Sequence, residues 1–145
     1  MKKQIYNTLA DTLATVADIA HVGLWNNQLQ YIAEEQPFDT PAVFIEFEPT
    51  QWSELLHGVR EAVVTVRLHV VTDSRVGRWA DIVDVFDLHE RINAALHAVH
   101  RIETDGSVID SLALAADATD HNFDELRDDT LDYRCHVTDR SGYAR

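Results

Sequence analysis

The sequence of 145 residues is poor in cysteine, glycine and long apolar runs. Its single cysteine, Cys135, excludes a framework of internal disulfide bonds and fits a reducing compartment. The five glycines are all isolated, which argues against a glycine-rich loop that cradles phosphate groups. No apolar run approaches the ~20 residues of a membrane-spanning helix, and Asp11 and Asp18 interrupt the apolar residues after Lys2 and Lys3, unlike a signal peptide. We therefore expect a soluble, cytoplasmic protein with no membrane partner.

Positive charge is scarce as well. Twelve Lys and Arg stand against 25 Asp and Glu, which gives a net charge of −13. This balance disfavours nucleic-acid binding, because phosphates need clustered Lys and Arg, and it keeps a subunit soluble until it meets its partner. With 46% of its residues apolar, the chain suffices for one domain with its own core, spanning residues 1–145.

The hydrophobic period changes in the central part of the chain. Apolar and polar residues alternate through Glu61–Asp73, which predicts a strand with one packed face. Arg78–His100 instead carries apolar residues at helical spacing. We expect this helix to lie on one face of the sheet and to form the core with it. The predicted apolar positions are Val64, Val66, Leu68 and Val70 in the strand, and Ile82, Val85, Phe86, Ile92, Leu96 and Val99 in the helix.

The flanking segments complete an α+β chain with an antiparallel or mixed sheet and two main helices packed on one face. The expected segments are a helix over residues 2–20 that ends near Gly23, two short extended pieces around Asn26 and Asn27 (the second being Gln28–Ile32), a polar loop Glu34–Pro41, strand Ala42–Glu48, a turn around Gly106, and strands Ser111–Thr119 and Leu131–Thr138.

The segment Thr50–Arg60 joins two predicted strands and is longer than an ordinary hairpin turn, so we expect a projecting loop. It carries Trp52, Leu55 and Leu56, and tryptophan often anchors a protein interface. Two interpretations of Trp52 stay open, an interface anchor and a side chain that folds back on the core.

The segment Asp120–Asp129 is strongly acidic and includes Asp124, Glu125, Asp128 and Asp129. It lacks the central glycine and terminal glutamate of an EF-hand loop, which argues against a calcium site. We expect a solvated loop, with an interaction surface for a basic partner as the second interpretation.

The remaining polar clusters have ordinary structural explanations. His97, His100 and Glu103 have a spacing that could place three ligands together, but histidines also suit the negative end of a helix, so we predict no metal site. Cys135 and His136 are neighbours on a strand and point to opposite faces, which excludes a thiol–base pair. We predict no catalytic, cofactor-binding or metal-binding residue.

Charged side chains lie on the polar faces of two predicted strands. Glu46 and Glu48 belong to one strand, and Arg67 and His69 belong to the other. We expect opposite-charge pairs across the strands, each contributing about 0.2–1 kcal/mol.

The order of elements resembles the tail terminator, or tail completion, proteins of long-tailed bacteriophages. Val63–Val71, which leads into the helix, and Asp124-Glu125 followed by Leu131–Cys135 carry the resemblance. It covers nearly the whole chain as a pattern of elements and includes no short motif, so no site residue is transferred.

The resemblance implies a structural virion protein without catalysis or cofactor. Copies of the chain would form a ring, usually hexameric, that ends polymerisation of the tail tube and joins the tail to the head connector. Its partners would be other copies of itself, the tube protein, and a connector or stopper protein, within a virion assembled in the host cytoplasm. Trp52, Leu55, Leu56 and the acidic residues Asp124, Glu125, Asp128 and Asp129 are the candidate contacts. The acidity would suit a channel through which DNA slides.

Other hypotheses remain open at this point. Another neck or connector component would have similar elements. A small enzyme or ligand-binding α+β domain would need a pocket, for which Glu46, Arg67 and His69 are the available polar residues. A regulatory or immunity-type protein would use its acidic surface to mask a basic partner.

Overall fold

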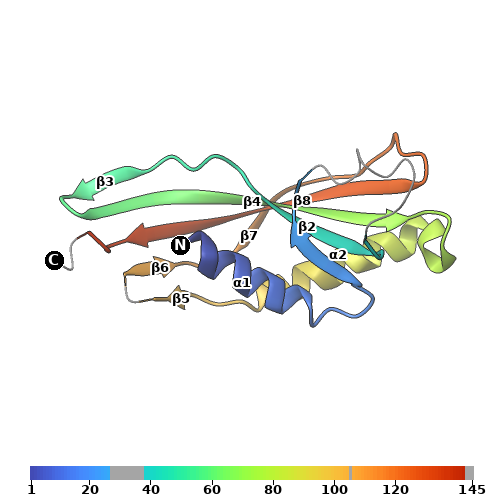
Figure 1. Cartoon of the computed structure of the whole chain (residues 1–145), viewed down its shortest axis with the longest axis horizontal. Coiled ribbons are helices and arrows are strands. Elements are labelled where there is room, and N and C mark those ends of the chain that lie inside the picture. The colour runs from blue at the N-terminus through green and yellow to red at the C-terminus, as the bar shows by residue number, and fades with distance from the viewer. Residues whose placement is uncertain (27–37, 105, 143–145) are drawn as a thin grey trace.

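The computed structural model describes residues 1–26, 38–104 and 106–142 and contains a mixed sheet with two α-helices on one face (Figure 1). This confirms the predicted fold class. The elements are α1 (Lys2–Leu13), β1 (His21–Leu24), β2 (Ala42–Phe47), β3 (Ser53–Leu56), β4 (Val59–Asp73), the 3₁₀ helix η2 (Gly77–Ala80), α2 (Ile82–His97), β5 (Ile102–Glu103), β6 (Ser107–Ile109), β7 (Ala113–Ala118) and β8 (Leu126–Asp139).

The eight strands form a curled sheet with the order β1-β2-β4-β8-β6-β5. Two further pairings lie off this path, β3 beside the start of β4 and β7 beside β8. Only β1 and β2 are parallel among the described pairs. The two long strands β4 and β8 pair from Arg60 opposite Asp139 to Asp73 opposite Leu126 and form the axis of the molecule.

The alternation along β4 and β8 separates the sheet into two faces. The inner face packs on both helices and forms the main core, because α1 and α2 each present one apolar stripe to it. Its buried residues include Val64, Val66, Leu68 and Val70 of β4, Leu131, Tyr133, Cys135 and Val137 of β8, Ile5, Leu9 and Leu13 of α1, and Val85, Leu88, Ile92 and Leu96 of α2. The outer face carries a small second cluster of Phe38, Ala42, Phe44 and Val71.

The predicted long helix Arg78–His100 is divided. A 3₁₀ turn, η2, buries Trp79, and α2 then begins after Asp81, whose carboxylate accepts a hydrogen bond from the Val83 backbone N–H at 3.0 Å. Aspartate at this position satisfies a backbone donor that the helix leaves free. The predicted stripe is correct for most of its positions, but it missed Leu88 and included Phe86, which is exposed.

The first predicted helix is too long. α1 ends at Leu13 and not at residue 20, and Asp18 adopts a left-handed backbone conformation with φ of 78°. Gly23 lies inside β1 and does not end a helix, since β1 is drawn into the sheet by its pairing with β2. The predicted extended piece Gln28–Ile32 lies outside the described residues, and so does the first half of the predicted loop Glu34–Pro41.

The predicted loop Thr50–Arg60 is wrong, because much of it is a β-hairpin. Strand β3 pairs with the start of β4, and the turn between them contains Gly58 with φ of 82°. Glycine has no Cβ and adopts this backbone conformation without strain, which permits the tight connection. The hairpin extends past the helices at the end of the molecule where the amino terminus lies (Figure 1).

The acidic segment is also more ordered than predicted, since β8 begins at Leu126 and includes Asp128 and Asp129. The pairing of this end with the last residues of β4 extends the strand. Strand β7 has a bulge between Leu114 and Ala116, which breaks the predicted alternation, and all of its residues are exposed. No helix among the described residues is long and apolar enough to cross a membrane.

Candidate functional site

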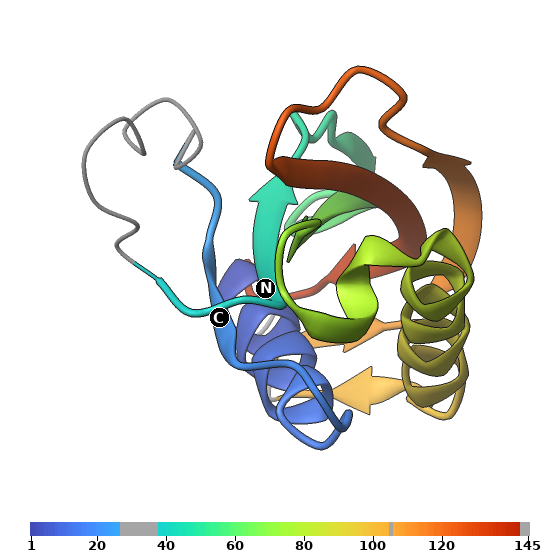
Figure 2. The same ribbon diagram turned by 90° about the vertical axis from the view of Figure 1, so that its right-hand side faces the viewer.

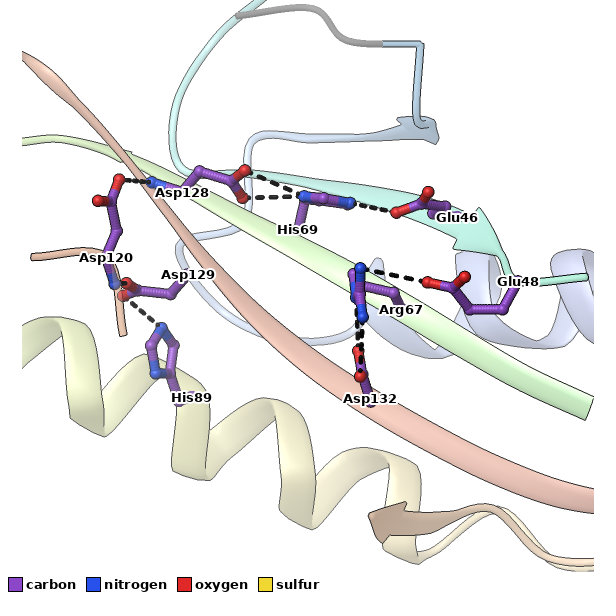
Figure 3. A network of polar contacts seen from close by, with 9 residues as sticks. All are labelled: Glu46, Glu48, Arg67, His69, His89, Asp120, Asp128, Asp129 and Asp132. Carbon is purple, nitrogen blue, oxygen red and sulfur yellow. Dashed lines mark hydrogen bonds and ion pairs between the residues drawn. The ribbon is translucent and has the colours of Figure 1, made fainter. Parts of the chain in front are cut away.

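His69 is held between two carboxylates on the outer face of the sheet (Figure 3). Its Nε2 lies 2.7 Å from Oε1 of Glu46 on β2, and its Nδ1 lies 3.0 Å from Oδ1 of Asp128 on β8. A neutral imidazole has one N–H donor, whereas both nitrogens here face carboxylate oxygens, so the arrangement needs the protonated ring. Burial by itself lowers the pKa of His69, but the hydrogen bonds and charges of Asp128 and Glu46 outweigh it and raise the pKa above its ordinary value.

Arg67 repeats this arrangement two residues earlier on β4. Its guanidinium forms two hydrogen bonds with Asp132, at 2.9 and 3.2 Å, and its Nη1 lies 3.2 Å from Oε1 of Glu48. Asp132 stands directly opposite Arg67 in the ladder, so register alone brings the pair together. The predicted ion pairs of Arg67 and His69 with the two glutamates are confirmed.

A third side chain between two carboxylates lies further along the same face. His136 places Nε2 2.9 Å from Oε2 of Glu61 and Nδ1 3.5 Å from Oδ2 of Asp110. The ring or guanidinium nitrogens of all three side chains therefore face carboxylates from neighbouring segments of the sheet. Glu46, Arg67 and His69, the available residues for a ligand pocket, do lie together, but their charges are compensated within the sheet.

Several carboxylates of the acidic segment form hydrogen bonds within the subunit. The side chain of Asp120 accepts hydrogen bonds from the backbone N–H groups of Asn122 and Asp128, at 2.9 and 3.1 Å. Asp129 is fully buried, accepts from the Asp120 backbone N–H at 2.7 Å and lies 3.2 Å from Nε2 of His89 on α2 (Figure 3). The expectation of a solvated loop is therefore wrong for this part of the segment.

The four predicted acidic contacts divide into two pairs. Asp128 hydrogen-bonds to His69, and Asp129 accepts from the Asp120 backbone N–H and lies 3.2 Å from Nε2 of His89. Asp124 and Glu125 are exposed, and Glu125 forms an ion pair with Arg75 at 3.0 Å.

The three predicted contact residues of the hairpin differ in their exposure to solvent. Leu55 and Leu56 lie beside the turn and are 53% and 54% exposed. Trp52 is half-buried and packs against the main core, with the Arg60 guanidinium 4.3 Å above its ring. Of the two interpretations left open for Trp52, the structure shows the side chain folded back on the core.

A groove between α2 and β7 was not expected from the sequence. Its volume is about 370 Å³, and its apolar lining includes Phe86 and Leu114, which are 42% and 41% exposed. Figure 2 shows β7 and α2 side by side along one flank of the molecule. A bulged strand and an outward-turned Phe in an amphipathic helix are the signals that could have suggested it.

The other candidate sites are a metal-binding cluster and the thiol of Cys135. Within residues 1–26, 38–104 and 106–142, no group of three or more His, Cys, Asp or Glu is arranged to hold a metal ion. Cys135 is buried in the core, and burial raises the pKa of its thiol to about 11. The prediction that Cys135 and His136 point to opposite faces is confirmed, because His136 bonds to Glu61 on the outer face.

Comparison with known proteins finds matches among solved structures. No family model matches the chain, and no curated protein does. A chain in a solved structure described as "Virion of native gene transfer agent (GTA) particle" is similar with a TM-score of 0.54 and 15% sequence identity. The similarity covers 90% of this chain and 84% of that one. This chain therefore shares the fold of a chain of that virion over nearly its whole length.

Proposed function

We propose that the protein is a structural component of a phage or phage-like virion and acts as a tail terminator. The observation that carries the proposal is the fold shared with a chain of a gene transfer agent virion over 90% of the sequence. The resemblance of the element order to tail terminators supports the finer assignment.

In this role, copies of the chain form a ring, as a hexamer, on the end of the tail tube. The ring stops tube polymerisation and presents its other side to the head connector or stopper protein. It acts through surfaces and assembly and not through catalysis. The ion pairs on the outer face support this role. They hold neighbouring strands together, so the sheet keeps its shape when other subunits bind to it.

The exposed tip of the hairpin and the exposed part of the acidic segment are the proposed contact surfaces. Leu55 and Leu56 offer apolar contact area, while Asp124 and Glu125 offer negative charge toward a basic partner surface. Trp52, Asp128 and Asp129 have a supporting role here, since they fix the hairpin and the start of β8 from within the subunit.

The test is electron microscopy of lysates from the producing phage or prophage with this gene deleted. We expect headless tails of uncontrolled length, and their correction when the gene is restored on a plasmid. Normal tails joined to heads would overturn the proposal.

A further inference from the structure

The groove between α2 and β7 continues along one flank of the molecule, where the two elements lie side by side (Figure 2). It consists of two hollows of about 370 and 460 Å³, which adjoin because Asn93 and Leu114 line both of them. From Phe86 in the first hollow to His97 in the second, the groove follows α2 for about 16 Å, given a rise of ~1.5 Å per residue. This length matches about five residues of extended chain.

The carboxylates in the lining of this groove have no cationic partner. Glu90 of α2 and Asp117 of β7 are exposed, and neither forms a hydrogen bond or an ion pair with a residue that the structure describes. Among the described residues, no Lys or Arg lines either hollow. On the outer face of the sheet, by contrast, Glu48 and Asp132 both pair with Arg67. The groove therefore carries negative charge that its own subunit leaves uncompensated.

A third carboxylate lies behind the wall of the groove. Asp129 is fully buried, and its Oδ2 lies 3.2 Å from Nε2 of His89 without hydrogen-bonding geometry. His89 is itself part of the groove lining. The charge of Asp117 also acts on the core beneath, because it adds to burial in raising the pKa of Tyr133. Charges beside a low-dielectric interior act over longer distances than in water, so the groove attracts positive charge.

Apolar side chains flank the two exposed carboxylates. Phe86 and Leu114 are 42% and 41% exposed and line the same hollow as Glu90 and Asp117. Lysine and arginine have an aliphatic stem that packs on apolar surface and a charged head that reaches carboxylates. Arginine also packs well on aromatic rings. The lining thus has the two kinds of surface that a basic side chain needs.

We propose that the groove binds an extended segment of another protein, through a lysine or arginine with an apolar residue two positions away. Phe86 and Glu90 are one turn apart on α2, which is about 6 Å along the helix axis. Alternate residues of an extended chain are about 6.6 Å apart and point to the same side. The apolar residue therefore reaches Phe86 while the basic side chain reaches Glu90 and Asp117.

The occupant is a different protein and not a second copy of this chain. The chain has a net charge of −13, and its only lysines are Lys2 and Lys3. Most of its described arginines already pair with carboxylates of their own subunit, namely Arg60, Arg67, Arg75, Arg78, Arg91 and Arg101. An acidic groove repels a second acidic copy, and it repels nucleic acid for the same reason. A basic segment of a partner protein has the complementary charge.

The test titrates the isotope-labelled full chain with the peptide acetyl-Leu-Ser-Arg-Ser-Leu-amide and follows the backbone amides by NMR. The peptide has a leucine two positions from the arginine on each side, so it fits the groove in either chain direction. We expect chemical-shift changes centred on α2 and β7. Replacing the arginine by citrulline, which has the same shape without the charge, should weaken binding at least about fivefold.

Two double variants separate the groove from the overall charge of the chain. E90Q/D117N removes both exposed groove carboxylates and should weaken binding of the arginine peptide at least about fivefold. D11N/D87N makes the same change in net charge at two exposed residues outside the lining and should bind the peptide as the wild type does. Circular dichroism checks that both variants are folded.

Four results would overturn the inference. They are no shift changes at about 5 mM peptide, equal affinity for the citrulline peptide, unchanged binding by E90Q/D117N, and equal weakening by D11N/D87N. Peptide binding at the groove does not depend on a role at the tail tube, so this proposal and the deletion experiment fail separately.

Discussion

The indole ring of Trp25 lies flat on the imidazole ring of His69, with the ring centroids 3.7 Å apart and 4° between the planes. Glu46 and Asp128 hold the imidazole in that plane from its two edges. A protonated imidazole against an aromatic face is an attractive cation–π contact. The backbone N–H of Trp25 also bonds to the Ile45 carbonyl at 2.9 Å, so the contact fastens the end of β1 across β2 to β4.

We predict that stability falls as the pH rises through the pKa of His69. Because its pKa in the folded protein is raised above the ordinary value of 6.5, the contribution is complete below 6.5 and is lost as the pH rises through the folded-state value. Urea unfolding at a series of pH values measures this. Glu46, Asp128 and Trp25 contact the ring, and Phe44 stands opposite His69 in the ladder.

The control for this prediction is H69Q, which cannot change charge. We expect it to lower the unfolding free energy by about 1–3 kcal/mol at low pH and to flatten the pH dependence, since an amide satisfies the two carboxylates poorly. An unchanged slope in H69Q would show that a group other than His69 governs the pH effect.

The pair of Arg67 and Asp132 is predicted to stabilise the centre of the sheet. D132A removes the acceptor of two hydrogen bonds and should cost about 1–2 kcal/mol, reduced because Arg67 is partly solvent-exposed. D87A removes the exposed pair of Asp87 with Arg91 on α2 and should cost less than about 0.5 kcal/mol. Chemical denaturation compares them, and equal losses would contradict the ranking.

The two faces of α2 should respond very differently to truncation. Leu88→Ala leaves a cavity in the main core and should destabilise the protein by about 2–5 kcal/mol. Val83→Ala lies on the exposed face and should change stability by less than about 0.5 kcal/mol. Thermal unfolding followed by circular dichroism separates the two, and a large effect at Val83 would mean that this face is covered in solution.

The thiol of Cys135 should be unreactive in the native protein. It is buried, and its pKa is raised to about 11, so little thiolate is present or accessible near neutral pH. A thiol reagent such as 5,5′-dithiobis(2-nitrobenzoate) should react only as the sheet opens. V63C supplies a matched exposed thiol that should react at once, and rapid reaction at Cys135 would show that β8 opens locally.

Patterns within single segments predicted the central elements well. The alternation in β4 and the helical spacing in α2 depend on neighbouring residues, and the alternation also placed Arg67 and His69 on the polar face. Two errors came from neighbours outside the segment. β3 became a strand because β4 gave it a ladder and Gly58 gave it a turn, and β8 was extended because the end of β4 was there to pair with it.

The sequence by itself determined the fold class, the two faces of the central strands and the low content of basic residues, because these follow from period, composition and charge. Only the tertiary structure decided which carboxylates are used internally. Asp128 and Asp129 are adjacent in the sequence, yet the pleat sends one to His69 on the outer face and the other to His89 beneath the inner face. The groove beside Phe86 likewise exists only in the folded protein, because its lining comes from α2, β7 and β8, which are separate in the sequence.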